Sequence, residues 1–286
     1  MRQQIDADWI RNAAETFIDS SPENTLENPA GEKAFDKPLV GFASGDDPIF
    51  EDYKEHVGPF HLTPWEIFAL TFGDPTVTPE ELTVISYILP QTEATKADNR
   101  KEDAWPSERW ARARIFGEEV NVKLRKHLVA ALKSEGCRAV APLLTPQFSM
   151  RLSPKYGFAS TWSERHAAYA AGLGTFSLCD GLITPVGKAM RTGSVVAQLK
   201  IPPTQRPYDD HQAYCLFFSK GICKKCAERC PAGAITEAGK DKMLCYQYVR
   251  KTAKYVKAHF GFDGYGCGLC QTGVPCESKI PLKQSD

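Results

Sequence analysis

Eight of the ten cysteines in this 286-residue chain lie between Cys215 and Cys276. Their spacing reads Cys-x7-Cys-x2-Cys-x3-Cys-Pro, then a lone cysteine, then Cys-x2-Cys-x5-Cys. Eight thiolates are the ligands that two [4Fe-4S] clusters need, and in the Cys-x2-Cys-x3-Cys-Pro run the cysteine before proline binds the other cluster. This rule predicts one cluster on Cys215, Cys223, Cys226 and Cys276, and a second on Cys230, Cys245, Cys267 and Cys270.

Zinc and disulfides are the two alternative uses of these thiols. Structural zinc sites also contain Cys-x2-Cys pairs, but they need neither the Cys-Pro step nor the lone Cys245, and His259 is not spaced for a mixed site. The N-terminal segment MRQQIDADWIRNAAETF has neither the apolar core of a signal peptide nor a twin-arginine pair. We therefore expect a cytoplasmic protein with reduced thiols, and the pattern favours iron–sulfur over zinc.

The composition is that of an ordinary globular protein, with 42% hydrophobic and 24% charged residues. Lysine plus arginine and aspartate plus glutamate both number 35, so no net charge attracts a polyanion. No apolar run approaches the roughly 18 residues that a membrane span requires. These features favour neither a membrane protein nor a dedicated nucleic-acid binder.

Hydrophobic periodicity predicts helices over residues 6–20, 107–136 and 163–171, and strands over 83–89 and from Cys137 onward. Thr63-Pro64-Trp65-Glu66 has the signature of a capping box that opens another helix. The polar stretch 91–106 is interpreted as a solvated loop, with a substrate lid as the functional alternative. The lone Cys137 is typical of a small buried residue.

The alanine-rich helix 163–171 is followed by Gly172-Leu173-Gly174. This Gly-x-Gly lacks the third glycine and the preceding strand of a dinucleotide-binding fingerprint, so we reject a Rossmann site. Glu164, Arg165 and His166 place an acid, a guanidinium and an imidazole together, a trio that is usually structural when it stands alone.

Six segments carry a resemblance to a known family: VISYILP, RARIFGEEVNVKLRKHL and SERHAAYAAGLGTF upstream, and CAERCPAGAI, DKMLCYQY and YGCGLCQTGVPC among the cysteines. In these segments, over roughly residues 80–281, the chain resembles the epoxyqueuosine reductases and the catalytic core of reductive dehalogenases. The cysteine motifs are highly specific, and the upstream motifs are less so.

The resemblance implies an α+β fold. A nitroreductase-like α/β domain with an N-terminal helical extension (1–205) would precede a ferredoxin-like module with two [4Fe-4S] clusters (206–286). It also implies that the clusters deliver electrons to a corrinoid such as cobalamin, or to a small substrate, in the α/β domain. By position, the cofactor-binding candidates are Arg112, Arg114, Glu164, Arg165, Gly172 and Gly174.

The chain departs from the family at its proton donor. The family's aspartate falls within GFASTW, where this chain has Phe158 or Ala159. A proton would then have to come from His166, Tyr87 or Tyr156, which are the catalytic candidates.

Further departures concern the cysteines and the substrate. The family's Gly-Lys-Asn is replaced by Ser177-Leu178-Cys179, and one family cysteine falls on Lys220, for which Cys215 substitutes. The last spacing, Cys270-x5-Cys276, is longer than the family's. The sequence ends at Asp286, without the helical repeats that help those reductases hold tRNA, so we expect a small-molecule substrate rather than tRNA.

The sequence therefore predicts a cytoplasmic iron–sulfur oxidoreductase of the epoxyqueuosine reductase or reductive dehalogenase type, reduced by a ferredoxin or flavodoxin. The alternative is an electron-relay or binding protein that serves a partner enzyme and has no active site of its own. The missing aspartate and lysine fit this alternative.

Overall fold

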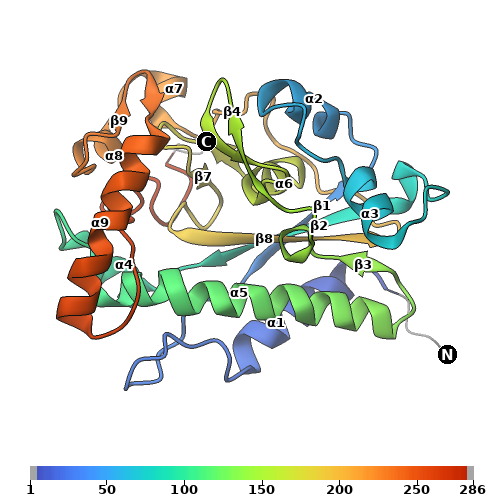
Figure 1. Cartoon of the computed structure of the whole chain (residues 1–286), viewed down its shortest axis with the longest axis horizontal. Helices are drawn as coiled ribbons and strands as arrows, with labels where there is room; N and C mark the ends of the chain where they lie inside the picture. Colours follow the sequence, from blue (N-terminus) through green and yellow to red (C-terminus); the bar gives the residue numbers. More distant parts are fainter. Residues whose placement is uncertain (1–4, 282–286) are drawn as a thin grey trace, which may run out of the picture.

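A four-stranded antiparallel sheet lies at the centre of the computed structural model, which describes residues 5–281 (Figure 1). Its strand order is β1–β2–β8–β3, with bounds Leu39–Ser44 for β1, Leu82–Pro90 for β2, Met190–Gln198 for β8 and Ala139–Val140 for β3. In β2, Ile85 and Leu89 pack into one hydrophobic cluster while Val84 and Ile88 pack into another. Because successive strand residues point to opposite faces, both faces of the sheet are covered.

Helices form a layer on each face of this sheet, and the three layers make an α/β/α sandwich (Figure 1). One face packs against α1 (Ala7–Ser20) and the long α5 (Glu108–Ser134). The opposite face packs against α2 (Ile49–His56), α3 (Pro64–Phe72) and α6 (Glu164–Ala170). The mixed helix and sheet class that the sequence predicts is confirmed.

Most of the predicted helix starts are confirmed by their caps. Thr63 and Glu66 form the predicted capping box of α3, and the Ser107 side chain accepts a hydrogen bond from the Trp110 amide at the start of α5. Gly136 follows α5 with φ +86°, a left-handed backbone that favours glycine.

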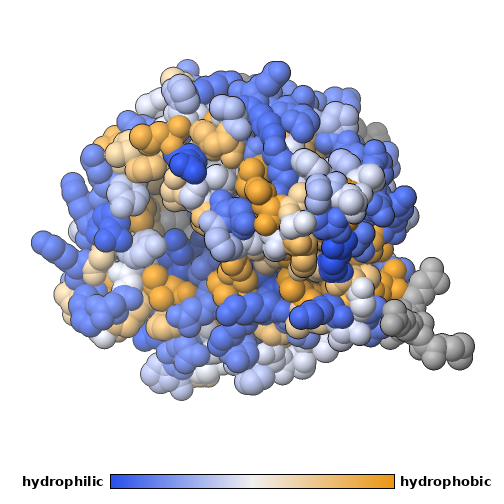
Figure 2. All heavy atoms as spheres, turned by 45° about the vertical axis from the view of Figure 1, so that its right-hand side comes forward, coloured by the Kyte–Doolittle hydropathy of each residue, from blue (hydrophilic) through white to orange (hydrophobic). Residues whose placement is uncertain are grey.

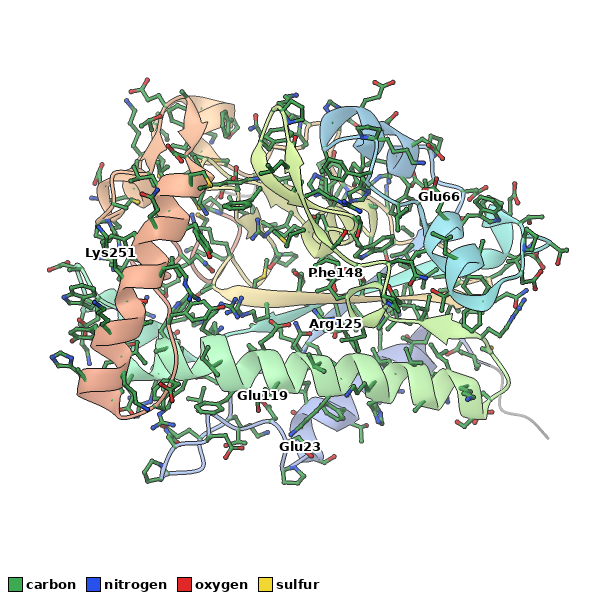
Figure 3. The ribbon with its side chains drawn as sticks, in the orientation of Figure 1. Glu23, Glu66, Glu119, Arg125, Phe148 and Lys251 are labelled. Carbon is green, nitrogen blue, oxygen red and sulfur yellow. The ribbon has the colours of Figure 1, made fainter. Side chains whose placement is uncertain are left out.

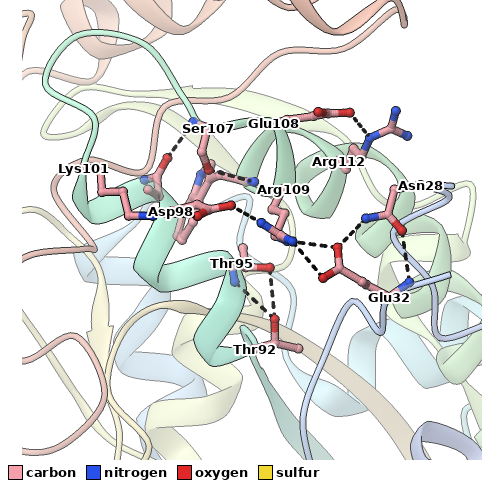
Figure 4. Close-up of polar contacts among 12 residues, drawn as sticks. Asn28, Glu32, Thr92, Thr95, Asp98, Lys101, Ser107, Glu108, Arg109 and Arg112 are labelled. Carbon is pink, nitrogen blue, oxygen red and sulfur yellow. Dashed lines mark hydrogen bonds and ion pairs between the residues drawn. The ribbon is translucent and has the colours of Figure 1, made fainter. Parts of the chain in front are cut away.

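The interpretation of residues 91–106 as a solvated loop is wrong for half of the stretch. Residues Glu93–Arg100 form α4, on which Thr95, Lys96 and Asn99 are buried. Figure 4 shows how Arg109 of α5 joins this helix to the N-terminal connection, by ion pairs to Asp98 and to Glu32. The polar side chains of α4 therefore make tertiary contacts, which a hydrophobic pattern cannot reveal.

The strand predicted from Cys137 onward is shorter than expected. β3 contains only two residues, because Pro142 begins a 3₁₀ turn, η2 (Pro142–Leu144). The remaining short elements of the sandwich are η1 (Pro79–Glu81), β4 (Met150–Ser153), β5 (Gly157–Ser160), β6 (Thr175–Phe176) and β7 (Leu182–Ile183). No helix within residues 5–281 has both the length and the apolar character needed to cross a membrane.

The cysteine segment, residues 215–276, packs against one end of the sandwich (Figure 1). Its elements are α7 (Leu216–Lys220), α8 (Lys225–Glu228), β9 (Ile235–Thr236), β10 (Gly239–Lys240) and α9 (Lys242–Phe260). At two glycines of this interface, Gly268 and Gly187, neighbouring atoms leave no room for a side chain. A Cβ on Gly268 would lie 1.9 Å from the Trp110 ring, and one on Gly187 would lie 2.1 Å from the Glu277 carbonyl oxygen.

Gly268→Ala should weaken this packing. Gly268 has φ +69° and Gly261 has φ +76°, but only Gly268 faces another side chain. We expect Gly261→Ala to cost about 1–2 kcal/mol for the left-handed backbone alone, and Gly268→Ala to cost a further ~1–3 kcal/mol for the clash with Trp110. Chemical unfolding of both variants measures the difference. Equal losses would show that the contact with Trp110 does not hold the segment in place.

Candidate functional site

The eight cysteines predicted to bind iron line two separate pockets. Cys215, Cys223, Cys226 and Cys276 line the smaller one, which we call the first pocket. The second pocket is lined by Cys230, Cys245, Cys267 and Cys270. The fold thus sorts the thiols into the same two sets of four that the Cys-Pro rule assigns, although the members of each set are interleaved in sequence.

The arrangement within each pocket suits a cluster. Among residues 5–281, no three histidine, cysteine or carboxylate side chains converge as a site for one metal ion. The four thiolates of a [4Fe-4S] cluster bind four different iron atoms, so they need not converge on a point. Four cysteines around one pocket are therefore a donor set that fits such a cluster.

A ninth cysteine, which the sequence interpretation did not assign, lies between the two sets. Buried Cys179 contacts the thiols of Cys226 and Cys270, one from each pocket. The ammonium of Lys188, itself 2% exposed, donates to the Cys179 sulfur at 3.3 Å. Hydrogen bonds from the two thiols, together with the Lys188 charge, hold the pKa of Cys179 well below its usual value. The chain therefore has a buried lysine beside the first pocket and a buried sulfur between the pockets.

The second pocket extends to the sandwich as a cavity of about 200 Å³. On the sandwich side its wall comprises Gln91, Trp110, Arg114, Met190 and Arg191, from the end of β2, from α5 and from the start of β8. On the other side lie the four cysteines, with Lys240 and Tyr248. The space-filling view shows hydrophilic and hydrophobic atoms interspersed on one face of the molecule, with a hollow in its left half (Figure 2).

Tyr87 does not lie at a reactive site. Its ring is fully buried under α5, and its hydroxyl donates to Asn121 Oδ1 at 2.8 Å. Burial raises its pKa well above the usual value. The prediction of Tyr87 as a proton donor is therefore wrong, because no substrate reaches the enclosed hydroxyl.

His166 and Tyr156 are also poorly placed for proton donation. The His166 ring packs against Tyr53, His61 and Phe176, and burial followed by the nearby His61 lowers its pKa well below 6.5. The imidazole is therefore neutral at pH 7 and carries no spare proton to donate. Tyr156 is 40% exposed in the turn between β4 and β5, where Lys155 and Lys242 lie over its ring. Neither residue lines either cysteine pocket.

Of the predicted cofactor-binding residues, only Arg114 lines the second pocket. Arg112 pairs with Glu108 at 2.8 Å and donates to the Glu27 carbonyl. Arg165 is exposed and donates to the Asp180 carbonyl. Gly172 and Gly174 allow close packing against Gln205 and Ile183. These side chains and glycines are accounted for by contacts within the protein.

Glu164 of α6 belongs to a buried ion-pair network with α5, which lies on the opposite face of the sheet. Arg125, 1% exposed and lying between α5 and β8 (Figure 3), is within 3.2 Å of Glu164 and within 3.1 Å of Glu118. Ser194 also donates to Glu164. Glu164 is thus paired within the protein and lines neither cysteine pocket.

The sequence interpretation missed the residues that complete the site, namely Gln91, Cys179, Lys188, Arg191 and Lys240. Only Cys179 carried a signal, since it stands where the related family has a different residue. The others reach the pockets because β2 and β8 end beside the cysteine segment, and that adjacency is a property of the fold.

Two curated relatives match a 119-residue stretch of the chain. The epoxyqueuosine reductase of Bacillus anthracis is 30% identical over 40% of this chain and 29% of its own length, and that of Bacillus cereus is 29% identical over the same shares. The predicted resemblance is confirmed. The matched stretch spans less than a third of each relative, and no protein-family model matches the chain.

Solved structures extend the likeness to the whole fold. The epoxyqueuosine reductase of Bacillus subtilis superposes with a TM-score of 0.51 and 18% identity, covering 88% of this chain and 64% of that one. The reductive dehalogenase NpRdhA, in complex with 3-bromo-4-hydroxybenzoic acid, gives a TM-score of 0.54 at 15% identity, covering 97% and 38%. At these identities the likeness shows a shared fold.

The buried histidines should make the fold sensitive to acid. His61 is 2% exposed, neither ring nitrogen has a hydrogen-bond partner among the described residues, and burial lowers its pKa to about 4. The unfolded chain binds a proton near pH 6.5 and the folded chain does not, so stability is complete above pH 6.5 and is lost as pH falls toward 4. The contribution of His61 is about 3 kcal/mol.

Replacing His61 with phenylalanine tests this expectation. Unfolding free energies of His61→Phe and wild type should diverge steadily as pH falls from 6.5 to 4, with the variant losing less stability. His166 keeps part of the acid sensitivity in the variant. Exposed His211→Phe is the control, and a pH-independent difference for His61→Phe would contradict a neutral buried imidazole.

Proposed function

We propose that the chain is an iron–sulfur oxidoreductase, which carries electrons through two [4Fe-4S] clusters to a small substrate beside the second pocket. The supporting observation is that eight cysteines interleaved in sequence line two pockets in sets of four. The relatives' names, epoxyqueuosine reductase and reductive dehalogenase, favour reductive chemistry. On this proposal residues 1–205 form the substrate-binding domain and 206–286 the electron-transfer domain.

The proposed route runs from the first pocket to the second. Next to Cys223 lies Ile222, which is 71% exposed, so an electron donor such as a ferredoxin or flavodoxin would meet the first cluster. Cys179 then lies between Cys226 and Cys270. The second cluster faces the cavity against the sandwich, where Arg114 and Arg191 are available to a substrate. The clusters, when bound, supply one-electron transfer.

A corrinoid does not fit the cavity beside the second pocket. Its volume of about 200 Å³ is below the roughly 300–1,000 Å³ of pockets that enclose drug-sized ligands, and a corrinoid is larger than such ligands. Most residues predicted to hold it make other contacts. We therefore assign the final transfer to a small substrate rather than to cobalamin.

Metal analysis tests the cluster assignment. Anaerobically reconstituted protein should contain about eight irons and eight sulfides per chain. Cys223→Ser and Cys245→Ser should each lower iron to about four or fewer, whereas Cys179→Ser and Cys137→Ser should retain about eight. Two zinc ions per chain, or an equal loss in Cys179→Ser, would contradict the assignment.

Lys188 and Lys240 should each raise the reduction potential of a different cluster. The Lys188 ammonium lies next to Cys179, Cys276 and Cys226, and Lys240 lies next to Cys270 and Cys245. A buried cation stabilises the more negative, reduced cluster, so its removal lowers the reduction potential. We expect Lys188→Met to lower the potential of the first cluster most and Lys240→Met that of the second.

Redox titrations followed by electron paramagnetic resonance would measure both potentials. Lys188→Arg keeps the charge and should keep the potential close to that of wild type. Potentials that are unchanged in both methionine variants would show that neither lysine acts on a cluster. If the clusters form but no small substrate oxidises them, the relay alternative gains support.

A further inference from the structure

The cavity beside the second pocket contains buried polar groups that the protein leaves without partners. Arg191 Nε and Gln91 Oε1 are both inaccessible to solvent and have no hydrogen-bond partner among residues 5–281. Both residues line the cavity. Buried polar groups are almost always hydrogen-bonded in native proteins, and an unpaired one points to a missing partner.

The charge of this cavity is positive. Arg114, Arg191 and Lys240 line it, and its wall contains no aspartate or glutamate. The nearest carboxylates are already engaged, because Arg125 is within 3.1 Å of Glu118 and 3.2 Å of Glu164. Within the described part of the chain, neither Arg114 nor Arg191 has a carboxylate within ion-pair distance, and Arg114 donates instead to the Tyr265 hydroxyl at 3.0 Å.

The two arginines repel each other. Burial, followed by the charge of Arg114, lowers the pKa of Arg191 to about 10. Arg191 therefore stays charged at pH 7, and two half-buried guanidinium groups line one cavity whose described wall contains no carboxylate. Such an arrangement is unfavourable unless an anion is present.

A cluster in the second pocket does not by itself explain both arginines. A [4Fe-4S] cluster with four thiolates is negatively charged, and Lys240 is a cation beside its ligands, since Cys270 and Cys245 are the main charges acting on that lysine. The charges that act most on Arg191 are those of Arg114, Glu118 and Arg165, not those of cysteines. Arg191 and Arg114 belong to the sandwich wall of the cavity, and the cysteines belong to the cysteine segment.

We propose that this cavity binds a small organic anion, whose carboxylate or phosphate group is held by Arg191 and Arg114. This inference rests on the proposed function, because it names the chemical class of the small substrate that would bind beside the second cluster. Guanidinium groups bind the oxygens of carboxylates and phosphates in a forked geometry. The amide of Gln91 gives a further polar contact, and Trp110 and Met190 provide apolar wall for the rest of the molecule.

Calorimetric titration of the cluster-loaded protein tests this site. Benzoate and inorganic phosphate are the two anionic probes, and benzamide is the neutral counterpart of benzoate. We expect one anion to bind at one site per chain, with benzamide at least tenfold weaker. Binding by benzoate alone would specify a carboxylate site, and binding by phosphate alone a phosphate site. The absence of binding by both anions would overturn the proposal.

Three variants assign the binding to the arginines. Arg191→Gln and Arg114→Gln should each weaken the anion by at least tenfold, and Arg191→Lys should lie between them and wild type. Arg112→Gln is the matched control, because Arg112 is on the same helix as Arg114 but pairs with Glu108 outside the cavity. Unchanged affinity in Arg191→Gln and Arg114→Gln would overturn the assignment.

Iron content and electron paramagnetic resonance spectra separate this inference from the proposed function. Intact clusters with weakened anion binding in Arg191→Gln support the anion site. Loss of the second cluster in both Arg191→Gln and Arg191→Lys would show that the arginine serves the cluster, which overturns the anion site alone. Wild-type protein that never takes up iron would instead overturn the proposed function.

Discussion

The attachment of the cysteine segment to the sandwich is the contact on which the site depends. The segment shares a small apolar cluster with the sandwich, and three of the eight buried members of this cluster, Cys215, Cys226 and Cys276, would bind iron. Polar contacts supply the rest. Buried Asn99 of α4 donates to the Cys267 carbonyl at 3.2 Å and to Thr272 at 3.1 Å, and Arg100 pairs with Glu277 at 2.8 Å. Short helix α4 therefore positions the C-terminal part of the segment, which contains Cys267, Cys270 and Cys276.

This attachment also explains why β8 begins where it does. The amides of Lys188 and Ala189 donate to the carbonyls of Cys276 and Glu277, which extends the pairing of β8 toward the last cysteine. The same turn directs the Lys188 side chain toward the first pocket, while Arg191 reaches the second. One strand end thus contributes a cation to each pocket, and the backbone contact at Gly187 fixes their distance from the sulfurs.

The sequence predicts different parts of this molecule with different success, for physical reasons. Periodicity and caps locate α1, α3 and α5 because these helices bury an apolar face. Periodicity does not locate helix α4, because its buried residues, Thr95, Lys96 and Asn99, are polar. The grouping of the cysteines follows from spacing, because the cysteine before Pro231 changes clusters. The sequence does not predict which arginines and lysines surround the pockets. Arg125 and Arg191 look alike in sequence, yet Arg125 forms ion pairs with two carboxylates, and the pocket that Arg191 lines contains none.

The surroundings of Arg125 and Arg191 distinguish a structural ion-pair network from the proposed substrate site. Arg125 pairs with Glu118 of its own helix, α5, and with Glu164 of α6, and it donates to the Thr192 carbonyl. Arg191 is the second residue of β8, one residue before Thr192, and lines the second pocket. The second guanidinium adds nothing to folding, because its Nε is buried without a partner among the described residues and an unpaired buried polar group is unfavourable. The position of Arg191 beside the second pocket is therefore better explained by a bound anion than by folding.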